Sequence, residues 1–241
     1  KPLVNALLQQ KKKQKMLDKQ KKQFTANVSH ELKTPLTSIA GYAELIETGM
    51  AKPEDIKPFA GVIRKQALRL VSLSEDIIQL SQLEESDDED MSFESVNLYE
   101  IAQRCVEALN INAINKCVTL NLIGEECYIR GKAQLVEELI YNLCDNAIRY
   151  NKENGNVTVT VNPLEKGASV SVKDTGIGIP KKYQERIFER FFRVDKSRSK
   201  ATGGTGLGLA IVKHITQLHD AKLEISSEEG KGTEIIVTFK D

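Results

Sequence analysis

Three absences limit what this chain of 241 residues can be. No apolar run approaches the roughly 20 residues that a membrane-spanning helix needs, and no signal-peptide pattern opens the sequence. Neither charge is in excess, because 34 basic residues balance 34 acidic ones. This balance disfavours a generally basic nucleic-acid binder and a globally disordered chain. We therefore expect a soluble chain without a nucleic-acid partner, with room for one large domain or two modest ones.

The cysteines also lack the spacing that a metal site or a disulfide framework needs. None of the four forms a C-x-x-C pair or clusters with the three histidines, so we expect reduced, packing thiols in a cytosolic compartment. The first residue is Lys rather than Met, which indicates a fragment of a longer protein.

The balanced total conceals two charged segments. Residues 1–23 carry eight Lys and one Asp, a net charge of +7, and residues 84–94 carry seven acidic residues and no base, a net charge of −7. We favour a solvated helical face for the basic segment, with a signalling coiled coil or contact with anionic lipid as alternatives. The acidic segment is typical of a solvated hinge. The predicted divisions are a basic helix at 1–23, a helical hairpin at 24–84, a hinge at 85–94 and a second domain at 95–241.

Apolar residues after Phe24 recur at the three- and four-residue spacing of a helical seam. The first series is Val28, Leu32, Pro35, Ile39, Tyr42 and Ile46, and the second is Ile56, Ile63, Leu70 and Ile77. The break at 48–53 predicts two antiparallel helices joined by a short loop. A single hairpin has too little surface to bury both seams, so we expect a homodimer with an all-α four-helix bundle.

Beyond the hinge, segments with helical and strand patterns alternate, which predicts an α/β sheet domain. Helices are expected at 98–110, 133–150 and 206–218, and strands at 118–122, 128–130, 157–161, 170–173, 223–227 and 234–239.

The helix expected at 133–150 has a polar side that needs an explanation. Asn142, Asn146, Arg149 and Tyr150 share this side at offsets of 4, 7 and 8 residues. Asn is mildly costly inside a helix, and an amide oxygen beside phosphate oxygens is a sensible Mg²⁺ ligand. The alternative is that the two amides are solvated or cap a neighbouring element.

Two glycine-containing turns follow in the sequence. Asp174, Gly176 and Gly178 come directly after an expected strand, where glycine permits a sharp turn and close approach to a ligand. The cluster 203–209 leads into an apolar helix, whose N-terminal amides can bind phosphate. The polar, cationic segment 188–202 between them is either a plain loop or a lid over a triphosphate.

Together these pieces resemble the nucleotide site of the family that includes sensor histidine kinases, gyrase-type topoisomerases, mismatch-repair ATPases and heat-shock chaperones. The resemblance implies an α/β sandwich, a mixed sheet backed by helices, that binds ATP and Mg²⁺. It implies that Asp174 binds the adenine amino group, that Asn146 holds Mg²⁺ and that Arg193 lies at the γ-phosphate. Arg149 and Tyr150 would then lie over the phosphates. The remaining implied nucleotide-binding residues are Asn142, Gly176, Gly178, Gly204, Gly206, Leu207 and Gly208.

Asn142 also bears on the reaction. Members of that family that hydrolyse ATP carry a Glu at this position to activate water, and an amide cannot abstract a proton. The substitution favours a kinase over an ATPase.

The candidate nucleophile is His30, in the sequence S-H-E-L-K-T-P-L. The seam positions place it on the outer side of the predicted bundle, where it should be exposed. A lone exposed His is usually a surface residue, but this sequence closely resembles the phosphoacceptor box of sensor histidine kinases. His214 and His219 lack such neighbours and are interpreted as structural or surface residues.

Glu31 and Thr34 are the candidate helpers of His30. The carboxylate of Glu31 can polarise the imidazole and accept its proton. Pro35 removes a backbone donor and predicts a kink just after the nucleophile. The resemblance implies that Glu31 and Thr34 also support dephosphorylation of a partner, with the Thr hydroxyl orienting water.

The sequence thus predicts the cytoplasmic kinase core of a bacterial sensor histidine kinase. The γ-phosphoryl group of ATP would pass to His30 and then to an Asp of a response regulator receiver domain. The resemblance implies an upstream sensor, so that the chain would meet the membrane only through a segment that it lacks. Two alternatives stay open: a nucleotide-gated binding module that has lost the kinase step, and an ATPase of the same superfamily.

Overall fold

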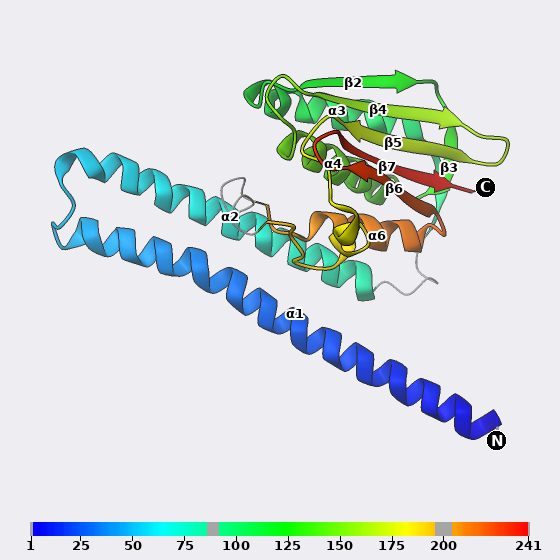
Figure 1. Cartoon of the computed structure of the whole chain (residues 1–241), viewed down its shortest axis with the longest axis horizontal. Helices are drawn as coiled ribbons and strands as arrows, with labels where there is room; N and C mark the ends of the chain where they lie inside the picture. Colours follow the sequence, from blue (N-terminus) through cyan, green and yellow to red (C-terminus); the bar gives the residue numbers. More distant parts are fainter. Residues whose placement is uncertain (1, 86–91, 196–203, 241) are drawn as a thin grey trace. The chain divides into compact units, whose positions relative to one another are not determined.

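The computed structural model describes residues 2–85, 92–195 and 204–240 (Figure 1). The chain divides into two compact units, Lys1–Glu75 and Asp76–Asp241. Residues 86–91, in the middle of the predicted acidic hinge, lie outside the described residues. So do residues 196–203, which are the last seven residues of the predicted lid and the first of the glycine cluster.

The first unit is a hairpin of two long helices, as predicted. Helix α1 spans Pro2–Glu47 and helix α2 spans Pro53–Glu85. Gly49 in the turn has a φ of +69°, which favours glycine. Helix α2 begins at a proline and carries Glu54 and Asp55 in its first turn, where acidic groups stabilise a helix N-terminus.

The seam of the hairpin is only half-buried in a single chain. The rings of Tyr42 and Phe59 meet across the hairpin with their centroids 4.9 Å apart. Pro35 and Leu73 are buried, whereas Val28, Leu32 and the other first-series positions keep intermediate exposure. The last residues of α2, from Asp76 onward, belong to the second unit.

The second unit is a mixed sheet with helices. Its five-stranded sheet has the order β2-β4-β5-β7-β6, in which only the β2–β4 pair is parallel, and β1 pairs with β3 in a separate antiparallel ribbon. The helices are α3 (Leu98–Asn115), α4 (Ala133–Arg149) and α6 (Gly208–Leu218). The strands are β1 (Glu94–Asn97), β2 (Thr119–Gly124), β3 (Tyr128–Gly131), β4 (Asn156–Pro163), β5 (Ala168–Asp174), β6 (Lys222–Glu228) and β7 (Gly232–Phe239).

The core lies between this sheet and the helices, which cover one of its faces (Figure 1). Along β4, Val157, Val159 and Val161 are fully buried, and the polar residues between them keep intermediate exposure. This alternation is typical of a sheet with one covered face. Helix α4 buries Leu139 and Leu143 against the sheet side and packs between α3 and α6. The α/β sandwich predicted from the resemblance is confirmed.

Strand β1 was not predicted. It begins at Glu94, the last residue of the predicted hinge, and continues into the predicted second domain, where Val96 pairs with Ile129 of β3. Asn97 ends the strand and caps α3, accepting hydrogen bonds from the amides of Tyr99 and Glu100. Exposure does not alternate along β1, because its first two residues are exposed and its last two are buried, so only the pairing with β3 reveals the strand.

Candidate active site

The polar side of α4 has the arrangement that its spacing predicted. Asn142, Asn146, Arg149 and Tyr150 all keep intermediate exposure. The Nδ2 of Asn142 donates to the carbonyl of Glu138 at 3.0 Å, and the Nδ2 of Asn146 donates to the carbonyl of Asn142 at 2.8 Å. Because each amide nitrogen is held by the preceding turn, each amide oxygen is left to act as an acceptor. A hard, neutral oxygen of this kind fits Mg²⁺.

Asp174 is fixed at the end of β5 by backbone donors. Its Oδ1 accepts hydrogen bonds from the amides of Gly176 at 2.7 Å and Thr233 at 3.3 Å. Burial raises the pKa of this carboxyl, and the two donors oppose that rise. A Cβ on Gly176 would lie 2.4 Å from the carbonyl oxygen of Tyr150. Glycine therefore lets this turn lie directly against the C-terminal end of α4.

The second glycine cluster meets the same side of α4. A Cβ on Gly208, the first residue of α6, would lie 2.6 Å from Oδ1 of Asn142 and 3.4 Å from Nδ2 of Asn146. A Cβ on Gly204 would lie 3.3 Å from the hydroxyl oxygen of Tyr150. The structure therefore brings together three segments that the sequence singled out separately.

The other predicted nucleotide residues lie near this cluster, in different settings. Gly206 has a φ of +78°, and a Cβ there would lie 3.2 Å from Nε of Arg193. Gly178 has a φ of +66° and is backed by the carbonyl of Glu228. The side chain of Leu207 is fully buried, so only its backbone can face a ligand. Arg149 forms an ion pair with Asp145 at 2.6 Å.

The candidate phosphoacceptor lies in the first unit, on α1. His30 is exposed, as predicted. The hydroxyl of Thr34, one turn later, is also exposed and donates to the carbonyl of His30 at 3.3 Å. Glu31 lies between the exposed face and the inside of the hairpin, and its Oε2 is 3.0 Å from an Nη of Arg69 on α2.

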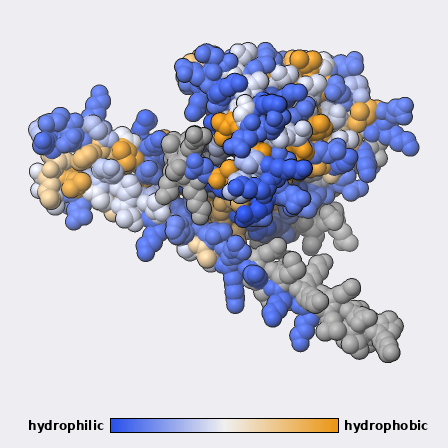
Figure 2. All heavy atoms as spheres, in the orientation of Figure 1, coloured by the Kyte–Doolittle hydropathy of each residue, from blue (hydrophilic) through white to orange (hydrophobic). Residues whose placement is uncertain are grey.

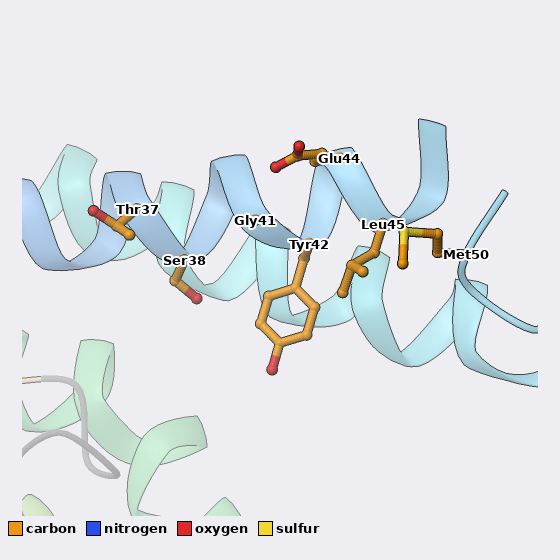
Figure 3. A pocket seen from close by; sticks show the side chains of 7 residues that line it. All are labelled: Thr37, Ser38, Gly41, Tyr42, Glu44, Leu45 and Met50. Carbon is orange, nitrogen blue, oxygen red and sulfur yellow. The ribbon is translucent and has the colours of Figure 1, made fainter. Parts of the chain in front are cut away.

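An open hollow lies along α1 beginning two turns after His30 (Figure 3). It is lined by polar groups, including Thr37, Ser38 and Glu44, and by the apolar side chains of Leu45 and Met50. Tyr42 projects beside it (Figure 3). This surface mixes polar and apolar contacts on the same helix as the candidate phosphoacceptor.

Sequence reasoning missed Arg69 and Glu138. Arg69 is 38 residues from its partner and has no local pattern that marks it. Burial, followed by the charge of Asp76, raises the pKa of Glu138 to about 7. Its Oε1 is buried and makes no hydrogen bond to any described residue. Nothing in one sequence indicates which of two adjacent glutamates in α4 is buried in this way.

The other two histidines have structural contacts, as predicted. His219 is buried, with Nδ1 donating to the carbonyl of Ile215 and Nε2 accepting from the amide of Lys132. Its ring stacks on Phe93, with centroids 4.9 Å apart. His214 contacts the carbonyl of Leu83 at 2.9 Å.

Two further features are absent from the described ranges. Among residues 2–85, 92–195 and 204–240, no three His, Cys, Asp or Glu residues are grouped as a metal site. None of the helices described there is long and apolar enough to cross a membrane.

Two family models match the chain. The model described as "His Kinase A (phospho-acceptor) domain" matches residues 20–86. The model described as "Histidine kinase-, DNA gyrase B-, and HSP90-like ATPase" matches residues 131–241.

Curated relatives match both domains together. The chain is 37% identical over 230 residues to the sensor histidine kinase WalK of Bacillus subtilis, covering 94% of this chain and 38% of that protein. It is 34% identical over 237 residues to the sensor protein kinase WalK of Staphylococcus aureus, covering 97% of this chain and 57% of that protein. The chain therefore spans between about a third and three fifths of the length of these relatives.

Solved structures share the fold. The histidine kinase ThkA in complex with the response regulator protein TrrA has a TM-score of 0.72 at 23% identity, covering 90% of this chain and 61% of that chain. The histidine kinase AdeS of Acinetobacter baumannii has a TM-score of 0.70 at 22% identity, covering 88% of this chain and 97% of that chain. The hairpin matches the phospho-acceptor model, the sandwich matches the ATPase model, and the relatives match both domains, so the chain belongs to the sensor histidine kinase family.

Proposed function

We propose that this chain transfers the γ-phosphoryl group of ATP to its own His30 and then to an aspartate of a response regulator. The observation that carries the proposal is the presence, on one chain, of an exposed His30 beside a carboxylate and of a glycine-lined polar face on α4. Phosphotransferase chemistry needs both a nucleophile and a site for the nucleotide phosphates.

In this proposal the second unit holds the nucleotide. The carboxylate of Asp174, already oriented by two backbone amides, accepts from the adenine amino group. Arg149, Tyr150 and Arg193 contact the phosphates, with the amides of Gly204, Gly206 and Gly208. The structure of ShkA in complex with AMPPNP, which has a TM-score of 0.64 at 24% identity and covers 90% of this chain and 46% of that chain, is a precedent for a nucleotide analogue bound to this fold.

Asn146 is the residue that would hold Mg²⁺, through the Oδ1 that its own helix leaves as an acceptor. The metal would neutralise charge on the triphosphate. A site with one protein ligand suits Mg²⁺, which commonly takes its other ligands from phosphates and water.

Asn142 explains why the phosphoryl group is kept for His30. It stands beside Gly208 at the start of α6, close to where the phosphates are proposed to bind. An amide there can accept or donate a hydrogen bond but cannot deprotonate water. Hydrolysis is then slow, and a nucleophile from the hairpin unit completes the reaction.

The transfer step needs a neutral imidazole. One ring nitrogen of His30 forms the N–P bond while the bond from the γ-phosphorus to the bridging oxygen breaks, leaving ADP. The proton on the other ring nitrogen passes to Glu31 and then to solvent. Histidine is a residue type suited to this step, because a neutral imidazole carries one ring nitrogen with a free lone pair and a proton on the other.

The partner in the second step is a receiver domain. The ThkA structure, in complex with a response regulator, provides the precedent. The hollow beside Thr37, Tyr42 and Leu45 lies on the helix that carries the phosphorylated His30, so we assign it to the contact surface (Figure 3). Thr34 would orient water for a second activity, the dephosphorylation of the regulator. Thr34→Ala should lower the rate of dephosphorylation and leave phosphorylation of His30 unchanged.

The hairpin would act as a homodimer. Leu36, Leu68 and Val71 are each more than half exposed in the single chain. Apolar residues also gather on the hairpin near its turn (Figure 2). A second hairpin would bury such exposed apolar surface in a four-helix bundle. The proposal that the longer protein carries a membrane-spanning sensor rests on the resemblance to sensor kinases.

The experiment is incubation with γ-labelled ATP and Mg²⁺, comparing wild type with His30→Gln. Label that is acid-labile and alkali-stable and that disappears in the variant supports the kinase. Nucleotide binding without label supports the gated binding module instead. Rapid phosphate release by His30→Gln would support the ATPase.

A further inference from the structure

The ion pair between Glu31 and Arg69 has properties that a surface ion pair lacks. The Nη of Arg69 lies 3.0 Å from Oε2 of Glu31, and the side chains are only 11% and 23% exposed. The Arg104–Glu137 pair of the other unit is 50% and 45% exposed. A largely buried carboxylate needs a hydrogen-bonded cation, because taking an unpaired charge out of water is costly. Arg69 thus fixes where the Glu31 carboxylate can lie.

The position of Glu31 in the sequence makes this constraint matter for the reaction. It follows His30 directly on α1, so the two side chains leave the helix about 100° apart. His30 is exposed, whereas Glu31 is turned toward α2 by Arg69. A carboxylate that turned fully outward would be solvated and mobile, and would meet the imidazole in only a fraction of its conformations.

We propose that Arg69 is a positioning residue for phosphorylation of His30: it holds Oε2 of Glu31 in place, so that the carboxylate next in the chain to His30 is oriented to take the proton that the imidazole must lose. The inference rests on the proposed function, in which Glu31 accepts that proton. Arginine suits the task because its guanidinium stays charged at every relevant pH and its planar donors orient a carboxylate.

The competing explanation is that the pair only clamps α1 to α2. A clamp needs opposite charges on the two helices, whichever helix carries each sign. A positioning role needs the carboxylate on α1, next to His30. Reversal of the pair separates the two explanations, because it restores the attraction between the helices but places a cation beside the nucleophile.

The first measurement is the rate of His30 phosphorylation at saturating ATP. Arg69→Gln should lower this rate about 10- to 100-fold and leave the KM for ATP unchanged, since nucleotide binds in the other unit. Arg69→Lys keeps the charge and should recover part of the rate. Arg64→Gln, at an exposed arginine on the same helix, is the matched control and should behave as wild type.

The decisive variant is the double exchange Glu31→Arg with Arg69→Glu. We expect its thermal unfolding midpoint to return toward wild type while its phosphorylation rate stays as low as that of Glu31→Gln. A recovered rate, or full activity of folded Arg69→Gln, would overturn the inference and leave the kinase assignment intact. Failure of the wild type to label His30 would instead overturn the proposed function itself.

Discussion

The two units differ in how much of their apolar surface a single chain can bury. In the sandwich, Leu98, Leu139, Val157 and Val237 have no measurable exposure. Among the described hairpin residues of the first unit, only Leu73, at 2% exposure, and Pro35 are buried, and Leu36 and Leu68 remain more than half exposed. The sandwich therefore has a complete core in one chain, whereas the hairpin leaves apolar surface exposed, which supports the proposal that a second hairpin covers it.

Function follows the same division. The sandwich presents turns that bring Gly176, Gly204 and Gly208 against α4 and its C-terminal end, which suits a site that must orient a nucleotide. The hairpin presents His30 on an exposed face, which suits a group that must meet a nucleotide site and then a regulator. Each of the following predictions tests one side of this contrast.

The largest effect is expected from the core of the sandwich. Leu139→Ala removes a fully buried side chain of α4 and should lower the free energy of unfolding of the second unit by about 2–5 kcal/mol. Leu68→Ala, at a side chain 59% exposed, should change the free energy of unfolding of the isolated chain by no more than about 0.5 kcal/mol. Urea unfolding at two protein concentrations measures both, because Leu68→Ala should act only on the concentration-dependent hairpin transition. Equal effects of the two variants would contradict the contrast.

The next effect is on catalysis. Asn146→Ala removes the proposed Mg²⁺ ligand and should lower His30 phosphorylation about 100-fold, equivalent to about 2.7 kcal/mol. Calorimetric titration with nucleotide and Mg²⁺ should show weaker metal-dependent binding, with the hairpin transition unchanged. Asn162→Ala, at an exposed asparagine of β4, is the control. Wild-type metal dependence in Asn146→Ala would exclude Asn146 as the ligand.

A smaller effect, of opposite sign, is expected at Glu138. Burial raises its pKa to about 7 from an ordinary 4.5, so between these values the folded state binds more protons and loses stability as the pH rises. Glu138→Gln removes the buried charge and should stabilise the second unit by roughly 1–2 kcal/mol at pH 8. The gain should disappear near pH 4.5, as followed by urea unfolding. Glu137→Gln, at a neighbour that is 45% exposed, should show no such gain.

The smallest effect concerns His219. Burial lowers its pKa, and its Nε2 faces the Lys132 amide donor, so the folded state resists a second ring proton. The unfolded chain takes up that proton as the pH falls through about 6.5, and the sandwich therefore loses stability from pH 7.5 to pH 5.5. His219→Gln should flatten this dependence. An unchanged pH profile in the variant would show that the ring is protonated without cost.

Much of the fold was readable from periodicity. The seam through Val28 and Ile39 predicted the hairpin, and the pattern at 157–161 predicted a strand. Strand β1 was missed because its exposed and buried residues do not alternate, unlike those of the equally short β3, and its identity depends on pairing with β3. The exposure of His30 was predicted because helical geometry alone sets which side of α1 it occupies.

The sequence by itself determined the order and chemical content of the site: His30 and Glu31, the paired Asn142 and Asn146, and the glycines near Asp174 and before α6. Local rules suffice there, because helical offsets and the conformational freedom of glycine act over a few residues. Only the tertiary structure decided that Gly208 lies against Asn142, that Arg69 holds Glu31 and that Glu138 is buried near Asp76. Those contacts join residues far apart in the chain, so they follow from packing of whole elements rather than from any local pattern.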